Sequence, residues 1–256
     1  MKSITTYFNQ KSANKYLSLG FIKGKGTFVR VRNDTVQAFS LKYNKDSYEC
    51  SVEFGIFPLC WSEKIFVEAG GYELDSFIVE QHMESSEPGL IRNSEDIMVR
   101  SVEKITKVID LYLIPFFDKC KDCESSLKEL IALEAIFEQN RLSLLRKNHE
   151  RDCAKPLQIR SLFDSRKYYM ALKAHNLPYA LQYLNQQIDY YMERIKTGMS
   201  NQPEVVKKGF LRKLEQASQE KELLVQNGFK HFDEMLRSNE VKNLELLKRD
   251  FPSIVN

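Results

Sequence analysis

The stretch that decides the fold is TFVRVRNDTVQAFSLKYNKDSYECSVEFGIF, Thr27–Phe57. Within it, polar and apolar residues alternate with a period of two, which is typical of strands. Turn-forming residues separate three such segments. The stretch therefore predicts three consecutive strands, Phe28–Arg32, Thr35–Tyr43 and Tyr48–Phe57, with turns at Asn33-Asp34 and Asn44–Ser47.

The third of these segments has two contrasting faces. One face carries Tyr48, Cys50, Val52, Phe54 and Ile56, and the other carries Glu49, Ser51 and Glu53. An antiparallel sheet with one buried and one open face shows this alternation. We therefore expect an antiparallel meander of four or five strands with a single buried side.

Helical patterns flank the meander. An apolar stripe before it ends at Gly20, a common residue just past a helix. After it, Ser94 caps a helix that we expect Pro115 to close. No strand pattern follows Asp118. The fold class predicted is α+β: an N-terminal helix and an antiparallel sheet packed on the Ser94 helix, followed by an all-helical C-terminal region.

The C-terminal region contains several separate helical patterns. Ser125 or Ser126 is expected to start the first, and the others are Asp164–Ala174, Pro178–Ile195, Pro203 to Asn227-Gly228, Phe229–Leu236 and Glu240–Leu247. We divide the chain into an α+β domain, 1–119, and a helical domain, 120–256, in which 203–256 is a charged extension. A thin apolar stripe in that extension favours docking within the chain, as a monomer or weak homodimer.

The run Leu19-Gly20-Phe21-Ile22-Lys23-Gly24-Lys25-Gly26-Thr27-Phe28-Val29-Arg30 is followed by Val36–Leu41, by strand residues up to Gly55-Ile56, and later by Ile114-Pro115-Phe116. This pattern resembles a bacterial family known as domain of unknown function 4304, over roughly residues 1–118. The resemblance implies an α+β domain with a helix-flanked antiparallel sheet. It implies no activity and no site residues.

Composition limits the classes of protein to consider. The chain has 256 residues, a formal net charge of +3 and five cysteines. The first residues contain no continuous apolar run, and no segment has the length of a membrane-spanning helix, so we expect neither a signal peptide nor a membrane span. A chain of this length does not need disulfides. We therefore expect reduced thiols and a cytoplasmic setting.

No motif indicates a metal, a cofactor or a catalytic group. Cys120-Lys121-Asp122-Cys123 is a C-x-x-C pair, but structural zinc needs a second close pair, and acidic neighbours disfavour a thiolate. The four histidines lack zinc spacing, and Gly24-Lys25-Gly26 lacks the phosphate-loop pattern. We expect two incidental cysteines, a turn at the glycines, and no cofactor.

Three residues are candidates for binding a partner. Arg30 and Arg32 lie on the same side of a strand as Phe28, and Trp61, the only tryptophan, follows the third strand. An arginine pair beside an aromatic ring on an open sheet face, and a loop tryptophan, can both contact another protein. The alternatives are an unoccupied sheet face and a tryptophan that folds back to cap the sheet.

These features suit protein recognition better than catalysis. We expect a bacterial cytoplasmic protein that binds an unknown protein partner without enzymatic activity, for example an immunity-type inhibitor of a toxin. The alternative is an enzyme whose site is assembled from distant residues. Nucleic-acid binding ranks lower, because the basic surplus in the N-terminal segment is local and the total is small.

Overall fold

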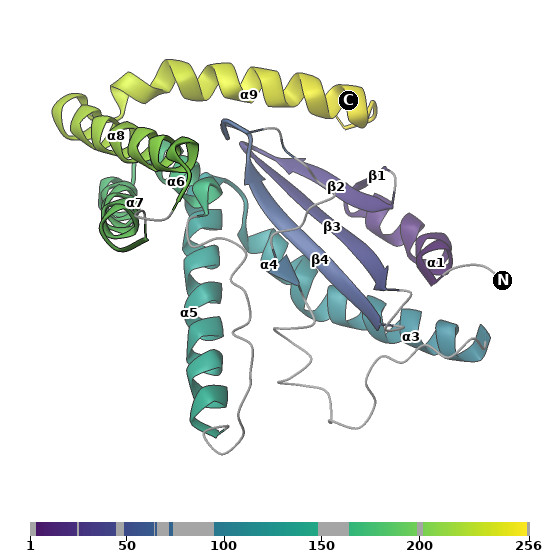
Figure 1. Cartoon of the computed structure of the whole chain (residues 1–256). Coiled ribbons are helices and arrows are strands. Elements are labelled where there is room, and N and C mark those ends of the chain that lie inside the picture. The colour runs from purple at the N-terminus through teal and green to yellow at the C-terminus, as the bar shows by residue number, and fades with distance from the viewer. Residues whose placement is uncertain are drawn as a thin grey trace.

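The computed structural model describes residues 4–24, 26–44, 49–63, 65, 72–73, 95–147, 164–198 and 202–254. It confirms the α+β class: an N-terminal helix, an antiparallel sheet and a mostly helical C-terminal region (Figure 1). Helix α1 spans Ile4–Ser18, and Gly20 follows with a φ of +82°. This left-handed conformation is the one that glycine adopts at little cost, as the sequence indicated.

Within the described residues, the sheet has five antiparallel strands in the order β1-β2-β3-β4-β5. Their bounds are Ile22–Lys23, Thr27–Arg32, Thr35–Asn44, Glu49–Pro58 and Tyr72–Glu73. Arg32 pairs with Thr35, so Asn33-Asp34 forms a two-residue hairpin turn in which Asn33 has a φ of +49°. The three long strands are those that the period of two predicted. The expected turn at residues 45–47 lies outside the described residues.

The helix after the sheet continues past Pro115, so the expectation that this proline closes it is wrong. Helix α3, Glu95–Val108, runs into a π-helical turn, η1, Ile109–Leu113, and then into α4, Ile114–Lys119. In the π turn the Ile114 N–H bonds to the Ile109 carbonyl, five residues back. The wider turn accommodates the proline ring, which in a regular helix clashes with a carbonyl of the preceding turn. Ser94, the expected cap, is not among the described residues.

Helix α5, Cys123–Lys147, starts before the two serines that we expected to start it. Asp122 is its cap: the Asp122 carboxylate accepts a hydrogen bond from the Ser125 N–H at 2.9 Å, and the Ser125 hydroxyl accepts one from the Asp122 N–H at 3.1 Å. This reciprocal pair is a capping box with the serine in the position usually held by a glutamate. The serine therefore belongs to the capping motif, but the expected start of the helix, Ser125 or Ser126, lies two or three residues after the observed start at Cys123.

The remaining described helices are α6, Ser165–Lys173, α7, Leu177–Gly198, α8, Glu204–Asn227, and α9, Lys230–Asp250. The first two form the predicted hairpin, and Gly228 ends α8 as expected. The two last predicted segments are a single helix, because nothing between Leu236 and Glu240 interrupts it. Among the described residues, no helix is long and apolar enough to cross a membrane.

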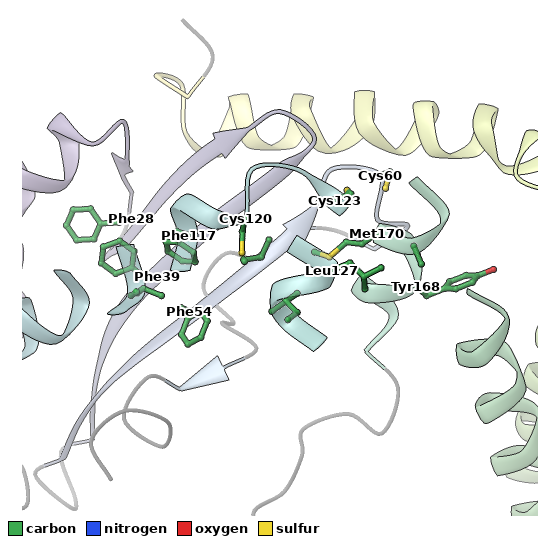
Figure 2. Close-up of a cluster of buried hydrophobic side chains, with 14 of the residues drawn as sticks. Phe28, Phe39, Phe54, Cys60, Phe117, Cys120, Cys123, Leu127, Tyr168 and Met170 are labelled. Atoms are coloured by element: carbon green, nitrogen blue, oxygen red, sulfur yellow. The ribbon is translucent and has the colours of Figure 1, made fainter. Parts of the chain in front are cut away.

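Apolar side chains cover both faces of the sheet, so the expectation of one open face is wrong. On one face, Phe28, Phe39 and Phe54 join α1, α3 and α4 in a large cluster that continues through Leu127 and Tyr168 into the helical region (Figure 2). On the other face, α9 supplies a smaller cluster, which we call the α9 cluster. Its buried members are Val29, Val36, Ala38, Phe57, Leu59, Ile65, Leu247 and Phe251.

The large cluster extends across Cys120, where we divided the chain. The α9 cluster likewise joins the C-terminal helix to strands β2, β3 and β4. The two-domain division stays a prediction, whereas docking of the charged extension within the chain is observed: α8 packs along α7, and α9 lies across the sheet (Figure 1).

Candidate functional site

Arg30, the first predicted partner-binding residue, is buried on the sheet face that α1, α3 and α4 cover, with 3% of its surface exposed. Its Nε donates to Gln37 Oε1 at 2.7 Å, its Nη1 to the Leu19 carbonyl at 3.1 Å and its Nη2 to Asp118 Oδ1 at 2.7 Å. The guanidinium also lies 4.5 Å from the centre of the Phe21 ring. The Nε, Nη1 and Nη2 donors of Arg30 thus all bind acceptors within the same chain.

This arginine connects elements that are distant in sequence. Gln37, which accepts from Arg30, donates to the carbonyls of Phe117 and Cys120 at 2.7 and 2.6 Å. Burial lowers the pKa of Arg30, and the hydrogen bond to Asp118 opposes that effect. The expectation of Arg30 on an open sheet face is wrong, and the network instead holds the end of α4 on β2 and β3.

The other two predicted residues lie elsewhere. Arg32 is exposed at the end of β2. Trp61 is half-buried; its ring stacks on Phe57 with centroids 6.1 Å apart, and its Nε1 donates to Ser165 Oγ at 3.0 Å. The tryptophan therefore folds back against the α9 cluster, which was the structural alternative. The structure does not bring Arg30, Arg32 and Trp61 together on one exposed surface.

Three cysteines of the described part of the chain are buried thiols. Cys60, Cys120 and Cys123 are free, and Figure 2 shows all three within the core. Burial raises the pKa of Cys120 to about 12. The pKa of Cys123 is also raised, mainly by its contact with Cys60 and, after that, by burial. Such thiols are poor nucleophiles. Within the described part of the chain, no three His, Cys, Asp or Glu side chains are grouped to hold a metal ion.

A cavity of about 480 Å³ lies between α1 and the α3–η1 helix. We call it the α1–α3 groove. Helix α1 contributes Tyr7, Lys11 and Ser12, and the facing helix contributes Val99, Val102, Glu103, Thr106, Lys107, Asp110 and Leu111. An open concavity with apolar walls and a few converging polar groups is the usual form of a binding site.

Hydroxyl and charged groups of α1 and the facing helix meet beside the groove. Ser12 Oγ lies 3.1 Å from Thr106 Oγ1, and Lys15 forms an ion pair with Asp110. The Tyr16 side chain is fully buried, and its hydroxyl lies near Thr106 and Asp110. Burial, and then the charge of Asp110, raise the pKa of Tyr16, so its hydroxyl stays protonated.

The rim of the groove is exposed. Lys11 Nζ lies 5.8 Å from the centre of the Tyr7 ring in a cation–π contact. Glu103 and Lys107 are exposed on α3. Leu111 is 55% exposed at the end of the groove. An exposed leucine beside a cavity is an available apolar contact, because burying such a side chain contributes about 2 kcal/mol.

Sequence reasoning missed this groove. Its residues on the second helix include Val99, Glu103, Thr106, Lys107 and Asp110, at helical spacing, and this pattern resembles any polar side of a helix. The signal that distinguishes it is the contact of α1 with α3, which joins Ser12 to Thr106 across 94 residues. A single sequence gives no indication that α1 packs against α3.

The groove does not form a recognisable catalytic arrangement. Ser12 is hydrogen-bonded to another hydroxyl, and Asp110 is paired with Lys15, so no described nucleophile in the groove touches a general base. No family model, curated protein or solved structure matches this chain. The resemblance to domain of unknown function 4304 therefore stays a prediction.

Proposed function

We propose that this chain is a non-enzymatic protein-binding module that takes a segment of a partner protein into the α1–α3 groove. The observation that carries the proposal is the exposed Leu111 beside a cavity of about 480 Å³. Interfaces are organised around apolar anchors seated in such pockets. Because Arg30 is internal and Trp61 is half-buried, the groove replaces the sheet face as the proposed contact surface.

The setting that we propose is the cytoplasm of a bacterium, with an immunity-type inhibitor as one concrete form of the binding protein. Buried free thiols at Cys60, Cys120 and Cys123 support a reducing compartment, because oxidising compartments favour disulfides. The pairing of Asp110 with Lys15 supports binding over catalysis, since it occupies a carboxylate of the groove lining.

Affinity capture of the tagged full-length chain from the lysate of its native cells tests the proposal. The informative variant is Leu111→Glu, and the matched control is Val225→Glu, at an exposed residue of α8 with 63% of its surface accessible. We expect a stoichiometric protein partner that is retained by wild type and by the control and lost by Leu111→Glu. Capture of no protein, or equal capture by both variants, contradicts the proposal.

A further inference from the structure

We propose that the partner segment in the α1–α3 groove is acidic and carries an apolar anchor residue; this inference rests on the proposed function. The apolar part follows from Val99, Val102 and Leu111, which line one side of the cavity. Val102 is buried at 2% exposure and closes the base, whereas Leu111 is open to solvent. A side chain that enters between them is removed from water on several sides.

The acidic part follows from the charges around the cavity. Helix α1 contains Lys11 and Lys15 and no acidic residue between Ile4 and Ser18. Lys15 neutralises Asp110. Lys11 and Lys107 remain on opposite sides of the groove, and neither has an acidic partner among the described residues.

Among the described residues of the lining, Glu103 is the other acidic residue besides the paired Asp110, so Lys11 and Lys107 exceed it by one charge. A carboxylate next to the anchor residue can reach either lysine at the exposed rim. Such complementarity at a rim selects among partners and speeds their association more than it adds affinity.

Selection of a random twelve-residue peptide library on the immobilised full-length protein tests the inference. We expect enriched peptides to combine aspartate or glutamate with leucine, isoleucine or phenylalanine. The double variant Lys11→Glu/Lys107→Glu should bind a synthetic consensus peptide about tenfold more weakly, as expected for two solvent-exposed charge contacts, and should select basic residues instead. Lys208→Glu/Arg212→Glu, at exposed positions of α8, is the control with the same change in charge.

Each outcome decides the inference. Acidic, apolar-anchored peptides whose preference inverts only in the groove variant support it. A consensus that ignores the groove charges, a library without enrichment, or selective binding of a single-stranded oligonucleotide in place of peptides overturns it. The proposed function is judged separately by the Leu111→Glu capture experiment, so a partner captured through the groove without an acidic consensus refutes the inference alone.

Discussion

Gly24 and Phe251 form a contact whose energetics can be tested by a double-mutant cycle. Gly24 lies in the turn between β1 and β2, where its N–H donates to the Thr27 carbonyl at 2.9 Å. Phe251 follows α9 and is buried in the α9 cluster with 8% of its surface exposed. A Cβ on Gly24 would lie 2.8 Å from Phe251 Cδ1 and closer still to Cε1. The backbone of Gly24 is outside the left-handed region, so alanine is compatible with it.

The expected energies follow from displacement of the ring. Removing a buried phenylalanine side chain costs about 3–5 kcal/mol, and the lower end applies to a residue at the edge of a small cluster. The Gly24→Ala methyl pushes the same ring out, and we expect a loss of about 2–3 kcal/mol. In a Phe251→Ala background the space is empty. There Gly24→Ala should stabilise by about 0.5 kcal/mol, because alanine restricts the unfolded chain.

Urea unfolding of the four proteins measures these values, with Trp61 as the probe. Trp61 is the only tryptophan, and its carbonyl accepts a hydrogen bond from Asn243 of α9 at 2.8 Å, so its fluorescence reports on this interface. The predicted coupling between the two substitutions is about 3 kcal/mol, within the range for residues in contact. Equal costs of Gly24→Ala in both backgrounds would refute the contact and the placement of Phe251.

Three further predictions concern buried polar groups. Asn243→Ala removes two hydrogen bonds to loop carbonyls and should lower the free energy of unfolding by about 2 kcal/mol, measured by urea unfolding, whereas exposed Lys242→Ala should change it little. Burial raises the pKa of Asp34 above 3.8, so its stabilising contribution is complete below that pH and is lost as pH rises through the raised value. Asp34→Asn should therefore gain stability relative to wild type as the pH rises from 4 through the raised pKa of Asp34, and a pH-independent difference would contradict this. Because Cys120 has a pKa raised to about 12, mass spectrometry should find it unalkylated by iodoacetamide until the chain is unfolded.

Local signals predicted the elements of this fold well. Alternation indicated β2, β3 and β4, and the glycines at 20 and 228 marked the ends of two helices. The sequence also contains a signal that the second face of the sheet is covered. Val29, Val36 and Ala38 are apolar, and they lie on the face of the sheet opposite to Phe28. The expectation of one open face rested on the polar side of β4 alone. Two apolar faces in neighbouring strands are typical of a sheet that is covered on both sides.

The sites depended on pairings that no local pattern specifies. Arg30 resembled a surface arginine because its partners, Gln37 and Asp118, are 7 and 88 residues away. A buried arginine needs such partners to offset the cost of leaving water, and their identity becomes visible only once α4 is packed on the sheet. The α1–α3 groove has the same origin, since Ser12 and Thr106 meet only when the two helices are adjacent.

The π turn links Pro115, which does not close the helix as expected, to the proposed binding site. Pro115 requires that the helix before it change its hydrogen bonding, and the bond from Ile114 N–H to the Ile109 carbonyl is that change. The same turn contains Asp110 and Leu111, two residues of the groove lining. Each residue inserted into a helix rotates the later residues of that helix by about 100°. The proline thus gives the π turn a structural cause, and Asp110 and Leu111 reach the lining of the α1–α3 groove from within that turn.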